Sequence, residues 1–404
     1  MKFSVLYLTN IFSDTAGGSE YMFWLYAKYM ARKGHDVYVM CFKRDENSLV
    51  RLRAETSKIN IVELVPEVEH KGVLFQDLLT NIKYLKSGFC ISGNLYRDVD
   101  LVHSNPYTPI LVGGLIKKLY KKAHVVTFHD IGTTMGIRFL YRWFREGGSS
   151  ALASYVKALV GVMYESSIVN VVPKDAIVVP SPQSKRDVDA ISLSKVRMYI
   201  LPNFIDTELY EKYKSKFKIS YEPCLLYIGR LVFYKNVHTI IKSFGQILQY
   251  NKDVKLFIIG DGPLRSLLYS YIRKHRLEKN IIMLGLATQE EKLKYLSRCT
   301  ATINLSIYEG FGLTVLESWY FEKPVIVSDI PPLNEIVETN MNGYTVNPLD
   351  RKKLTELMIQ IIDDSLLASR LGRNGLDKVK KDYTPEAVIP RLEEAYNDVL
   401  ISVR

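Results

Sequence analysis

Cysteine is scarce in this chain of 404 residues, and the few cysteines lie far apart. The four, Cys41, Cys90, Cys224 and Cys299, form no Cys-x-x-Cys pair. Such spacing supports neither a disulfide framework nor a zinc site. We therefore expect a protein of the reducing cytosol.

Long apolar runs and targeting signals are missing as well. No uninterrupted apolar stretch comes near the roughly 20 residues that a membrane span needs, and the first residues lack a small-residue cleavage pattern. The nearest candidate for a span, residues 151–172, contains Lys157 and Glu165. We interpret it as a buried helix followed by a strand, and expect a protein that is soluble or peripheral to a membrane.

Positive charge is in excess within an otherwise ordinary globular composition. The formal net charge is +11, with 47% hydrophobic and 24% charged residues. Residues 1–202 hold 26 Lys and Arg against 18 Asp and Glu, a net charge of +8, whereas the remainder holds 28 against 25. Such a field suits an anionic membrane, nucleic acid or a phosphorylated acceptor, and it equally suits a solvated, lysine-rich surface.

Two successive series of alternating strands and helices account for most of the chain. Strands of the first series are expected at residues 3–8, 36–42, 59–65, 101–103, 124–129 and 176–179. Strands of the second series are expected at residues 224–228, 255–259, 281–284, 302–305, 324–327 and 343–346. The alternation predicts α/β domains with parallel, doubly wound sheets.

The length of the chain fits two domains of about 150–200 residues better than one core. We place a first domain at residues 1–202, a polar linker at 203–222 and a second domain at 223–384. A final helix at 385–404 is expected to return to the first domain.

A glycine-containing segment, Glu309-Gly-Phe-Gly-Leu-Thr-Val-Leu-Glu317, follows a strand of the second series and opens a helix. Its glycines let the backbone come close to a ligand, and the first helical turn offers free N–H groups to a diphosphate. Glu317 can accept both ribose hydroxyls, and Glu309 lies on the phosphate and sugar side. Alternatively, both are surface carboxylates beside a tight turn. A nicotinamide site fits poorly, because its acidic residue follows the glycines by about 20 positions.

Two cations follow the first strand of the second domain. Arg230 ends the run Cys224-Leu-Leu-Tyr-Ile-Gly-Arg, and Lys235 follows shortly after it. Ligands of open α/β sheets bind at this end of a strand. Arg230 offers a fork of donors to phosphate oxygens and Lys235 a point charge. Because both can neutralise a diphosphate leaving group, we expect no metal ion and no other cofactor.

Six short motifs occur in a fixed order along the chain. They are GGSE at 17–20, TFHD at 127–130, GRLVFYKN at 229–236, GDGP at 260–263, the segment 309–317, and PVIVSD at 324–329 with NGYTV behind it. This series resembles glycosyltransferase family 4 over nearly the whole chain. The resemblance implies the GT-B fold, in which two Rossmann-like domains face a cleft, and a retaining glycosyltransferase of the hexosyl type.

The resemblance also implies roles for single residues. The catalytic residues would be His129, Arg230, Lys235 and Glu309, with His129 facing the sugar from the first domain. The donor would be bound by Gly18, Arg230, Lys235, Leu286 near the nucleobase, Glu309, Gly310, Phe311, Gly312, Leu313, Thr314 and Glu317.

The implied reaction moves a sugar from a UDP- or GDP-sugar to a glycan or lipid-linked acceptor. In the front-face mechanism, the acceptor hydroxyl attacks from the side on which the diphosphate leaves, and a phosphate oxygen takes its proton. No side-chain nucleophile is then required, and the sequence shows no second carboxylate placed for covalent catalysis.

Two features concern the acceptor side. Phe204 replaces the glycine of the family's Pro-Asn-Gly-Val-Asp run. We expect it to lie under the acceptor or to shift the interdomain turn. Arg138, Arg142 and Arg145 form one helical stripe beside aromatic residues that include Trp143. This pattern suits an anionic bilayer or a lipid-linked phosphate, and thus a cytoplasmic protein peripheral to the membrane. A packed helix with solvated arginines is the alternative.

Three other functions remain open at this point. A nucleotide-sugar 2-epimerase has the same architecture, but GGSE and the Gly-Arg-Leu element argue against it. A non-catalytic nucleotide-sugar-binding subunit would not need intact Arg230, Lys235, Glu309 and Glu317. Nucleic-acid binding is suggested by charge alone, and the sequence lacks the helix-turn-helix or aromatic-sheet signatures of such proteins.

Overall fold

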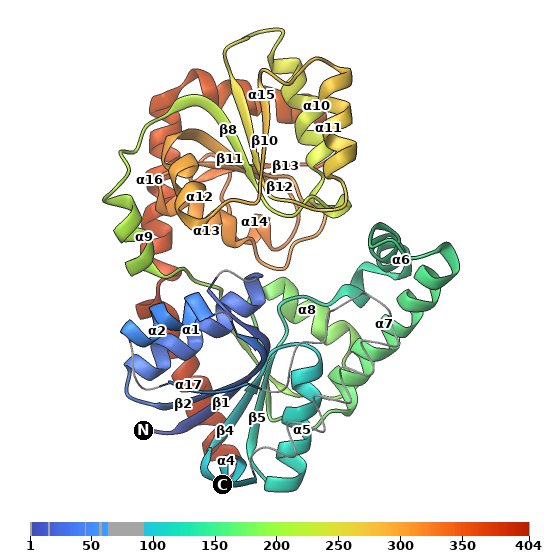
Figure 1. The fold of residues 1–404 in the computed structure, drawn as a ribbon, viewed down its shortest axis with the longest axis vertical. Helices are drawn as coiled ribbons and strands as arrows, with labels where there is room; N and C mark the ends of the chain where they lie inside the picture. The colour runs from blue at the N-terminus through green and yellow to red at the C-terminus, as the bar shows by residue number, and fades with distance from the viewer. Residues whose placement is uncertain (1, 15–16, 45, 56–58, 64–92, 404) are drawn as a thin grey trace. The chain divides into compact units, whose positions relative to one another are not determined.

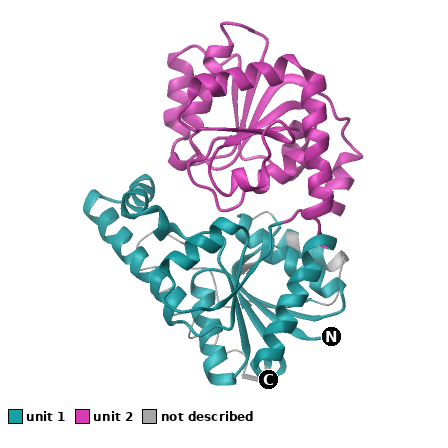
Figure 2. Ribbon diagram, turned by 180° about the vertical axis from the view of Figure 1, so that it is seen from behind, with its two compact units in different colours: residues 1–203, 386–404 teal, residues 204–385 magenta. Residues whose placement is uncertain are grey.

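The computed structural model describes residues 2–14, 17–44, 46–55, 59–63 and 93–403. The chain divides into two compact units: unit 1 comprises Met1–Asn203 and Glu386–Arg404, and unit 2 comprises Phe204–Pro385 (Figure 2). Each unit has one parallel sheet flanked by helices (Figure 1). The prediction of two doubly wound, parallel-sheet domains is confirmed.

The sheet of unit 1 has its strands in the order β3-β2-β1-β4-β5-β6-β7 over the described residues. These strands are β1 (Ser4–Phe12), β2 (Asp36–Arg44), β3 (Ile59–Glu63), β4 (Leu101–Ser104), β5 (Ala123–Thr127), β6 (Ala176–Val179) and β7 (Arg197–Ile200). The interior strand β1 is apolar on both faces, and Val5 to Leu8 have no exposed surface. This is the pattern of a parallel strand with helices on both sides.

The helices of unit 1 follow one another between these strands in the chain, except for α17, which comes after the last helix of unit 2. They are α1 (Gly18–Arg32), α2 (Glu46–Glu55), α4 (Gly93–Asp98), α5 (Thr108–Tyr120), α6 (Ile137–Glu146), α7 (Ala151–Val171), α8 (Pro182–Ile191) and α17 (Pro385–Val403), with the short 3-10 helix η1 (Gly132–Met135).

Unit 2 repeats the arrangement with a sheet in the order β10-β9-β8-β11-β12-β13. Its strands are β8 (Glu222–Ile228), β9 (Lys255–Ile259), β10 (Ile281–Gly285), β11 (Cys299–Asn304), β12 (Val325–Ser328) and β13 (Gly343–Val346). Its helices are α9 (Thr207–Lys214), η2 (Phe233–Lys235), α10 (Val237–Ile247), α11 (Arg265–Lys274), α12 (Gln289–Arg298), α13 (Leu313–Tyr320), α14 (Leu333–Ile336), α15 (Arg351–Asp363) and α16 (Ser365–Asp382).

Helix α17 packs on unit 1 through buried polar contacts. The Tyr396 hydroxyl lies 2.5 Å from His103 Nδ1 and 3.1 Å from the Tyr7 hydroxyl. Glu393 Oε1 lies 2.8 Å from His35 Nε2. These contacts join the last helix to the amino-terminal strands, so unit 1 consists of two separate chain segments.

Two segments differ from the sequence-based interpretation. The linker expected at 203–222 contains α9, whose Tyr210 is 1% exposed and belongs to the core of unit 2. Helix α7 was expected to be buried, but only 28% of its most apolar stretch of 18 residues is buried inside the protein. Among the described residues it is the one helix long and apolar enough to cross a membrane, judged by length and composition alone.

Candidate active site

The strand order of unit 2 changes direction at β8 and β11. β9 and β10 lie on one side of β8, whereas β11, β12 and β13 lie on the other. In open α/β sheets, ligands bind at the carboxyl ends of the strands at such a switch point. Arg230 and Lys235 follow β8, while Glu309 and Glu317 follow β11. The fold therefore brings the predicted cations and carboxylates to one edge of one sheet.

Glycines let the loops behind β8 and β9 approach each other closely. The Leu231 N–H donates to the Asp261 carbonyl at 2.8 Å, and the Gly229 N–H donates to the Ile259 carbonyl at 3.0 Å. At Gly260, which has a φ of 137°, a Cβ would lie 1.9 Å from the Gly229 carbonyl oxygen. Any larger residue there would displace the loop that carries Arg230. The GDGP motif thus supports the Arg230 loop.

Glu309 is held by three donors that all reach the same oxygen. Its Oε2 accepts from Lys235 Nζ at 2.7 Å, from Asn304 Nδ2 at 3.0 Å and from Ser306 Oγ at 3.1 Å. Burial raises the pKa of this carboxyl, but the charge of Lys235 and the three hydrogen bonds outweigh burial, so its pKa is lowered. Oε1 accepts no hydrogen bond from the described residues. A fixed, ionised carboxylate with one oxygen available can accept a sugar hydroxyl.

Tyr234 lies between the two predicted phosphate-binding cations. The Arg230 guanidinium donates to the Tyr234 hydroxyl at 2.5 Å and lies 6.0 Å from the centre of its ring. Lys235 Nζ lies 5.7 Å from the same ring. The Arg230 side chain is exposed, whereas that of Lys235 is 16% exposed. Contact with one ring brings both cations to the same end of β8.

The segment 310–314 forms the start of α13. Gly312 is the N-cap residue, with a left-handed φ of 101°, and Leu313 is the first helical residue. Phe311 is 4% exposed and packs edge-on against Tyr383, so its side chain is not available to a ligand. The first N–H groups of a helix have no intrahelical partners. The loop therefore presents donors and the positive end of the helix dipole to an anion.

Glu317, predicted to bind the ribose, already has two partners in the structure. Its Oε1 accepts from Lys292 Nζ at 2.7 Å and from the Tyr210 hydroxyl. Its Oε2 accepts no hydrogen bond from the described residues. Lys292 lies on α12 and Tyr210 on α9, so three elements fix this carboxylate in place.

Leu286 follows β10 and is 82% exposed. An exposed leucine at the carboxyl end of a strand can cover one face of a nucleobase. Gly18, in unit 1, is the first residue of α1, and its neighbour Gly17 is the N-cap residue of that helix.

His129 follows β5 in unit 1 and is buried. It is 9% exposed, and neither ring nitrogen has a partner among the described residues. Burial lowers its pKa to about 4, so the ring is neutral at pH 7. Buried polar atoms are nearly always paired, and exceptions are characteristic of functional sites. A neutral imidazole can donate through one nitrogen and accept through the other.

Glu165 of α7 fixes the loop that follows His129. Its carboxylate accepts from the Gly132 N–H at 3.2 Å, from the Thr133 N–H at 2.7 Å and from the Tyr107 hydroxyl at 2.9 Å. The Thr133 hydroxyl also donates to it. The charge that interrupts the apolar run of α7 in the sequence therefore anchors η1.

Sequence reasoning did not identify several residues of these networks. They are Asn304 and Ser306 around Glu309, Tyr234 between the cations, Tyr210 and Lys292 around Glu317, and Glu165 behind His129. Three of them stand near their partners in the sequence: Asn304 and Ser306 precede Glu309 by five and three positions, and Tyr234 directly precedes Lys235. Tyr210, Lys292 and Glu165 reach their partners through the fold alone.

The residues proposed for the acceptor side fall into two groups. Arg138, Arg142, Arg145 and Trp143 of α6 are exposed. Phe204 has no exposed surface. The expectation that Phe204 lies under the acceptor is therefore corrected: its side chain is buried within the protein and presents no face to a ligand.

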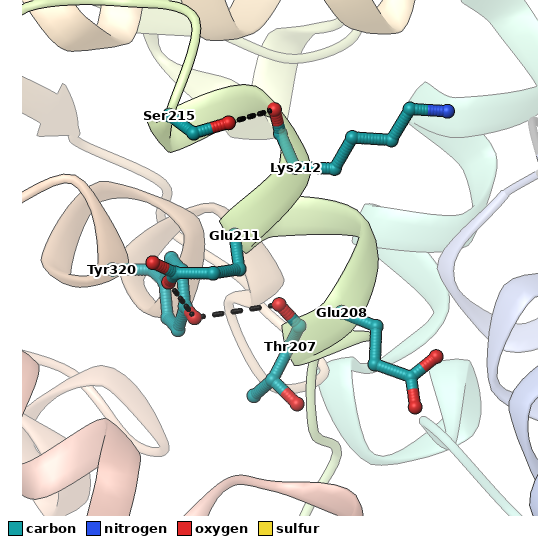
Figure 3. Close-up of a pocket in the computed structure, with 6 residues that line it drawn as sticks. All are labelled: Thr207, Glu208, Glu211, Lys212, Ser215 and Tyr320. Atoms are coloured by element: carbon teal, nitrogen blue, oxygen red, sulfur yellow. Dashed lines mark hydrogen bonds between the residues drawn. The ribbon is translucent and has the colours of Figure 1, made fainter.

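Unit 2 also has an open hollow of about 560 Å³ on the surface of α9, lined by Thr207, Glu208, Glu211, Lys212, Ser215 and Tyr320 (Figure 3). The Tyr320 hydroxyl donates to Glu211 at 2.8 Å, and the Ser215 hydroxyl donates to the Lys212 carbonyl at 2.8 Å. None of the predicted site residues lines this hollow.

Acidic side chains do not gather into a metal site in the part of the chain that the structure describes. The sequence has two Asp-x-Asp pairs, Asp98 with Asp100 and Asp187 with Asp189. Asp100 accepts from the Ser4 N–H at 2.8 Å, and Asp189 pairs with Lys185 at 2.6 Å. Both contacts lie within unit 1, whereas the predicted donor-site residues Arg230, Lys235, Glu309 and Glu317 belong to unit 2.

Two family models match consecutive parts of the chain. The family described as Glycosyltransferase Family 4 matches residues 16–209, and the family described as Glycosyl transferases group 1 matches residues 210–378. The uncharacterized glycosyltransferase MJ1178 of Methanocaldococcus jannaschii is 25% identical, over 88% of this chain and 93% of its own length. A glycogen synthase of Mycobacterium tuberculosis is 30% identical, over 43% of this chain and 42% of its own length.

Solved structures share the fold over nearly the whole chain. Sucrose-phosphate synthase from Thermosynechococcus elongatus has a TM-score of 0.78 and 19% identity, and the match covers 99% of this chain and 100% of that one. HepE of Anabaena in complex with UDP-glucose has a TM-score of 0.72 and 15% identity, with 98% and 100% covered. The solved structures show the GT-B fold, and through the two family models, which together match residues 16–378, the chain belongs to the group 1 glycosyltransferases.

Proposed function

We propose that this glycosyltransferase moves a hexosyl sugar from a UDP- or GDP-sugar to a glycan or lipid-linked acceptor, with retention of configuration and without a metal cofactor. The observation that carries the proposal is the arrangement around Glu309. One oxygen is fixed by Lys235, Asn304 and Ser306, and the other is available for a donor sugar hydroxyl. Arg230 and Lys235 both follow β8, so two positive charges are available there to stabilise a diphosphate.

The chemistry follows from these charges. The bond between the anomeric carbon and the diphosphate oxygen breaks, and its electron pair stays with the diphosphate. Arg230, Lys235 and the N-terminus of α13 stabilise the charge that develops there. The acceptor oxygen forms the new bond to the anomeric carbon, and its proton passes to a phosphate oxygen. Lys235 has two further N–H donors besides the one directed at Glu309.

The other roles are assigned by the same reasoning. Glu317 would accept from the ribose through its available oxygen, Leu286 would contact the nucleobase, and the backbone from Gly310 to Thr314 would contact the diphosphate. His129 and Gly18 would act from unit 1, His129 on the sugar and Gly18 on the phosphate. The HepE complex holds UDP-glucose, which supports UDP-sugars as the first donors to test. We place the reaction in the cytoplasm, at the cytosolic face of a membrane.

A donor screen with a matched control tests the proposal. Release of UDP or GDP from nucleotide sugars would be measured with and without a membrane extract as the source of acceptor. Lys235→Ala and Glu309→Ala are expected to abolish release that requires the extract. Lys378→Ala and Glu338→Ala remove another ion pair of unit 2, with a distance of 2.6 Å, and should leave release unchanged. Full activity of Lys235→Ala or Glu309→Ala would overturn the assignment.

A further inference from the structure

The sheet of unit 1 has a switch point of its own. β2 and β3 lie on one side of β1, whereas β4, β5, β6 and β7 lie on the other (Figure 1). In open α/β sheets, ligands bind at the carboxyl ends of the strands at such a point. In unit 1 these are the ends of β1 and β4. Asn105 is the first residue after β4, so it lies where a ligand of this sheet is expected.

Asn105 is held at the switch point by contacts with β1. Its side chain is buried, with 1% exposed. Its backbone N–H donates to the Leu8 carbonyl at 2.8 Å, and its Nδ2 donates to Thr9 Oγ1 at 3.3 Å. The Thr9 hydroxyl donates to the Ile11 carbonyl at 3.1 Å. Because a hydroxyl has one proton, Thr9 Oγ1 can only accept from Asn105, which fixes the orientation of the amide.

This orientation leaves the amide oxygen of Asn105 without a donor. No hydrogen-bond partner reaches Oδ1 from the described residues, although the atom is buried. Buried polar atoms are nearly always paired, so an unpaired one in a native structure needs an explanation. An amide oxygen accepts from a hydroxyl or an N–H group. A ligand that brings a hydroxyl to the end of β4 would supply the missing donor.

Other buried polar atoms without partners lie at the same edge of the sheet. β4 and β5 pair with Ser104 opposite Val126, so Asn105 and His129 follow neighbouring strands at the same end. Both ring nitrogens of His129 lack partners among the described residues, and so does Oδ1 of Asn203, which follows β7 and is 5% exposed. This edge of unit 1 therefore offers uncharged donors and acceptors, as a sugar with several hydroxyls requires.

The loops at this edge contain no lysine or arginine. The residues behind β1, β4, β5, β6 and β7, up to the next α-helix or the end of the unit, are 13–17, 105–107, 128–136, 180–181 and 201–203, and their charged side chains are those of Asp14 and Asp130. Arg138, in the helix behind the β5 loop, is exposed, whereas Asn105 and His129 are buried. Recognition of a phosphate relies on positive charge. An uncharged ligand fits this edge better.

We propose that the switch point of unit 1 binds the acceptor, and that Asn105 Oδ1 accepts a hydrogen bond from an acceptor hydroxyl. The acceptor presents an uncharged sugar there and not a phosphate. This inference rests on the proposed function and narrows it to the terminal sugar of a glycan, free or carried on a lipid. Thr9 is a positioning residue, because it acts through the amide of Asn105.

Chemical treatment of the membrane extract tests the class of acceptor without its identity. Periodate cleaves the vicinal hydroxyls of sugars, and alkaline phosphatase removes terminal phosphates. We expect periodate to abolish the release of UDP or GDP that requires the extract, and phosphatase to leave it unchanged. Loss of release after phosphatase treatment, or full release after periodate treatment, would overturn the proposal of an uncharged sugar.

Defined acceptors give the kinetic constants. The panel comprises methyl glycosides, octyl glycosides and 6-phosphates of glucose, galactose, mannose and N-acetylglucosamine, with UDP-glucose, UDP-N-acetylglucosamine and GDP-mannose as donors. We expect at least one glycoside to be used, with kcat/KM about tenfold or more above that of its 6-phosphate. Methyl and octyl glycosides separate a free glycan from one on a lipid. A preference for the phosphates, or no release with any glycoside, would contradict the proposal.

The role of Asn105 is tested with two variants. Asn105→Ala should raise the KM for the best glycoside by about tenfold, as expected for a lost hydrogen bond, and leave the KM for the donor unchanged. Thr9→Val has nearly the same shape and retains Asn105, but it lacks the oxygen that orients the amide. It should raise the same KM by severalfold. Thermal unfolding of each variant shows whether it folds.

Asn170→Ala is the matched control in the same unit. This amide has partners at both ends, since Oδ1 accepts from the Leu193 N–H at 2.6 Å and Nδ2 donates to the Ser166 carbonyl at 2.8 Å. Its loss should lower stability more than Asn105→Ala does and leave the KM for the glycoside unchanged. A KM that Asn105→Ala leaves unchanged, or that Asn170→Ala raises equally, would overturn the role of Asn105.

Calorimetric binding of UDP and GDP separates this proposal from the proposed function. Asn105→Ala is expected to bind the nucleotide as tightly as the unchanged chain does. Retained nucleotide binding together with an unchanged KM for the glycoside would count against the acceptor site alone. Absence of UDP and GDP binding in the unchanged chain would count against the donor site, and with it against the function on which this inference rests.

Discussion

His129 is a buried ring whose two nitrogens have no described partner, with a pKa lowered to about 4. A buried polar group without a hydrogen bond costs about 1–3 kcal/mol of stability. Such a cost is typical of residues kept for a ligand rather than for folding. The neutral ring can then serve a sugar hydroxyl without a competing internal contact.

Replacement of His129 should separate activity from stability. We expect His129→Ala to lower kcat/KM by about 100-fold, since the hydrogen bond proposed between His129 and the donor sugar would be lost from the transition state. The free energy of unfolding should change little, because removal of an unpaired polar group offsets the packing lost with the ring. Steady-state kinetics and urea unfolding on the same variant would show this. Unchanged kinetics together with a loss of stability would mean that His129 is only a packed core residue.

At the residue scale, the sequence predicts charged site residues better than their partners. Arg230, Lys235, Glu309 and Glu317 belong to short motifs that can be recognised by spacing. Tyr210 and Lys292 bind Glu317 from helices elsewhere in the chain. No local pattern marks them, because tertiary packing alone brings three helices to one carboxylate.

At the scale of the element, α7 shows why the burial of a helix could not be predicted from its sequence. Apolar residues surround much of this helix, and such a pattern usually indicates a buried helix. The structure leaves one side exposed and uses the other to anchor η1 through Glu165. Which side packs depends on the neighbouring elements, and the composition of the helix carries no information about them.

Glu165 should hold the loop behind His129. In Glu165→Ala, the N–H groups of Gly132 and Thr133 lose their acceptor, and stability is expected to fall by about 2–4 kcal/mol. Hydrogen exchange at the amides of Gly132 and Thr133 should accelerate. The factor by which kcat falls should exceed the factor by which KM rises. Ser167→Ala, at an exposed position of the same helix, serves as the control. Unchanged exchange at Gly132 and Thr133 would show that the carboxylate does not order this loop.

At the scale of the whole molecule, buried histidines predict sensitivity to acid. Burial lowers the pKa of His124 and of His129 to about 4 each, whereas the unfolded chain titrates near the ordinary value of about 6.5. Between these values the unfolded state binds more protons, so the free energy of unfolding falls as the pH drops from 6.5 to 4. Each ring contributes up to about 3 kcal/mol.

Urea unfolding at pH 7 and at pH 5 would measure this loss. His129→Gln should reduce the difference between the two pH values, because one titrating ring is removed. A free energy of unfolding that is constant between pH 7 and pH 5 would show that these rings are not buried as neutral groups in the folded protein.

The architecture of both units could be predicted from the alternation of apolar strands and helices, and the sheets confirm it. The strand order could not, because it depends on which crossovers pack against which face. That order places the ends of β8 and β11 side by side. The donor site proposed here depends on that juxtaposition.

Direct binding of a nucleotide diphosphate tests the central claim, that the carboxyl edge of the unit 2 sheet is the donor site. Calorimetry would compare UDP and GDP binding by the unchanged chain, by Arg230→Ala and by Lys378→Ala. We predict that Arg230→Ala weakens binding of the preferred nucleotide by about 10- to 100-fold, as expected for a lost charge-assisted contact, and that Lys378→Ala binds normally. Equal affinity of Arg230→Ala and the unchanged chain would contradict the claim.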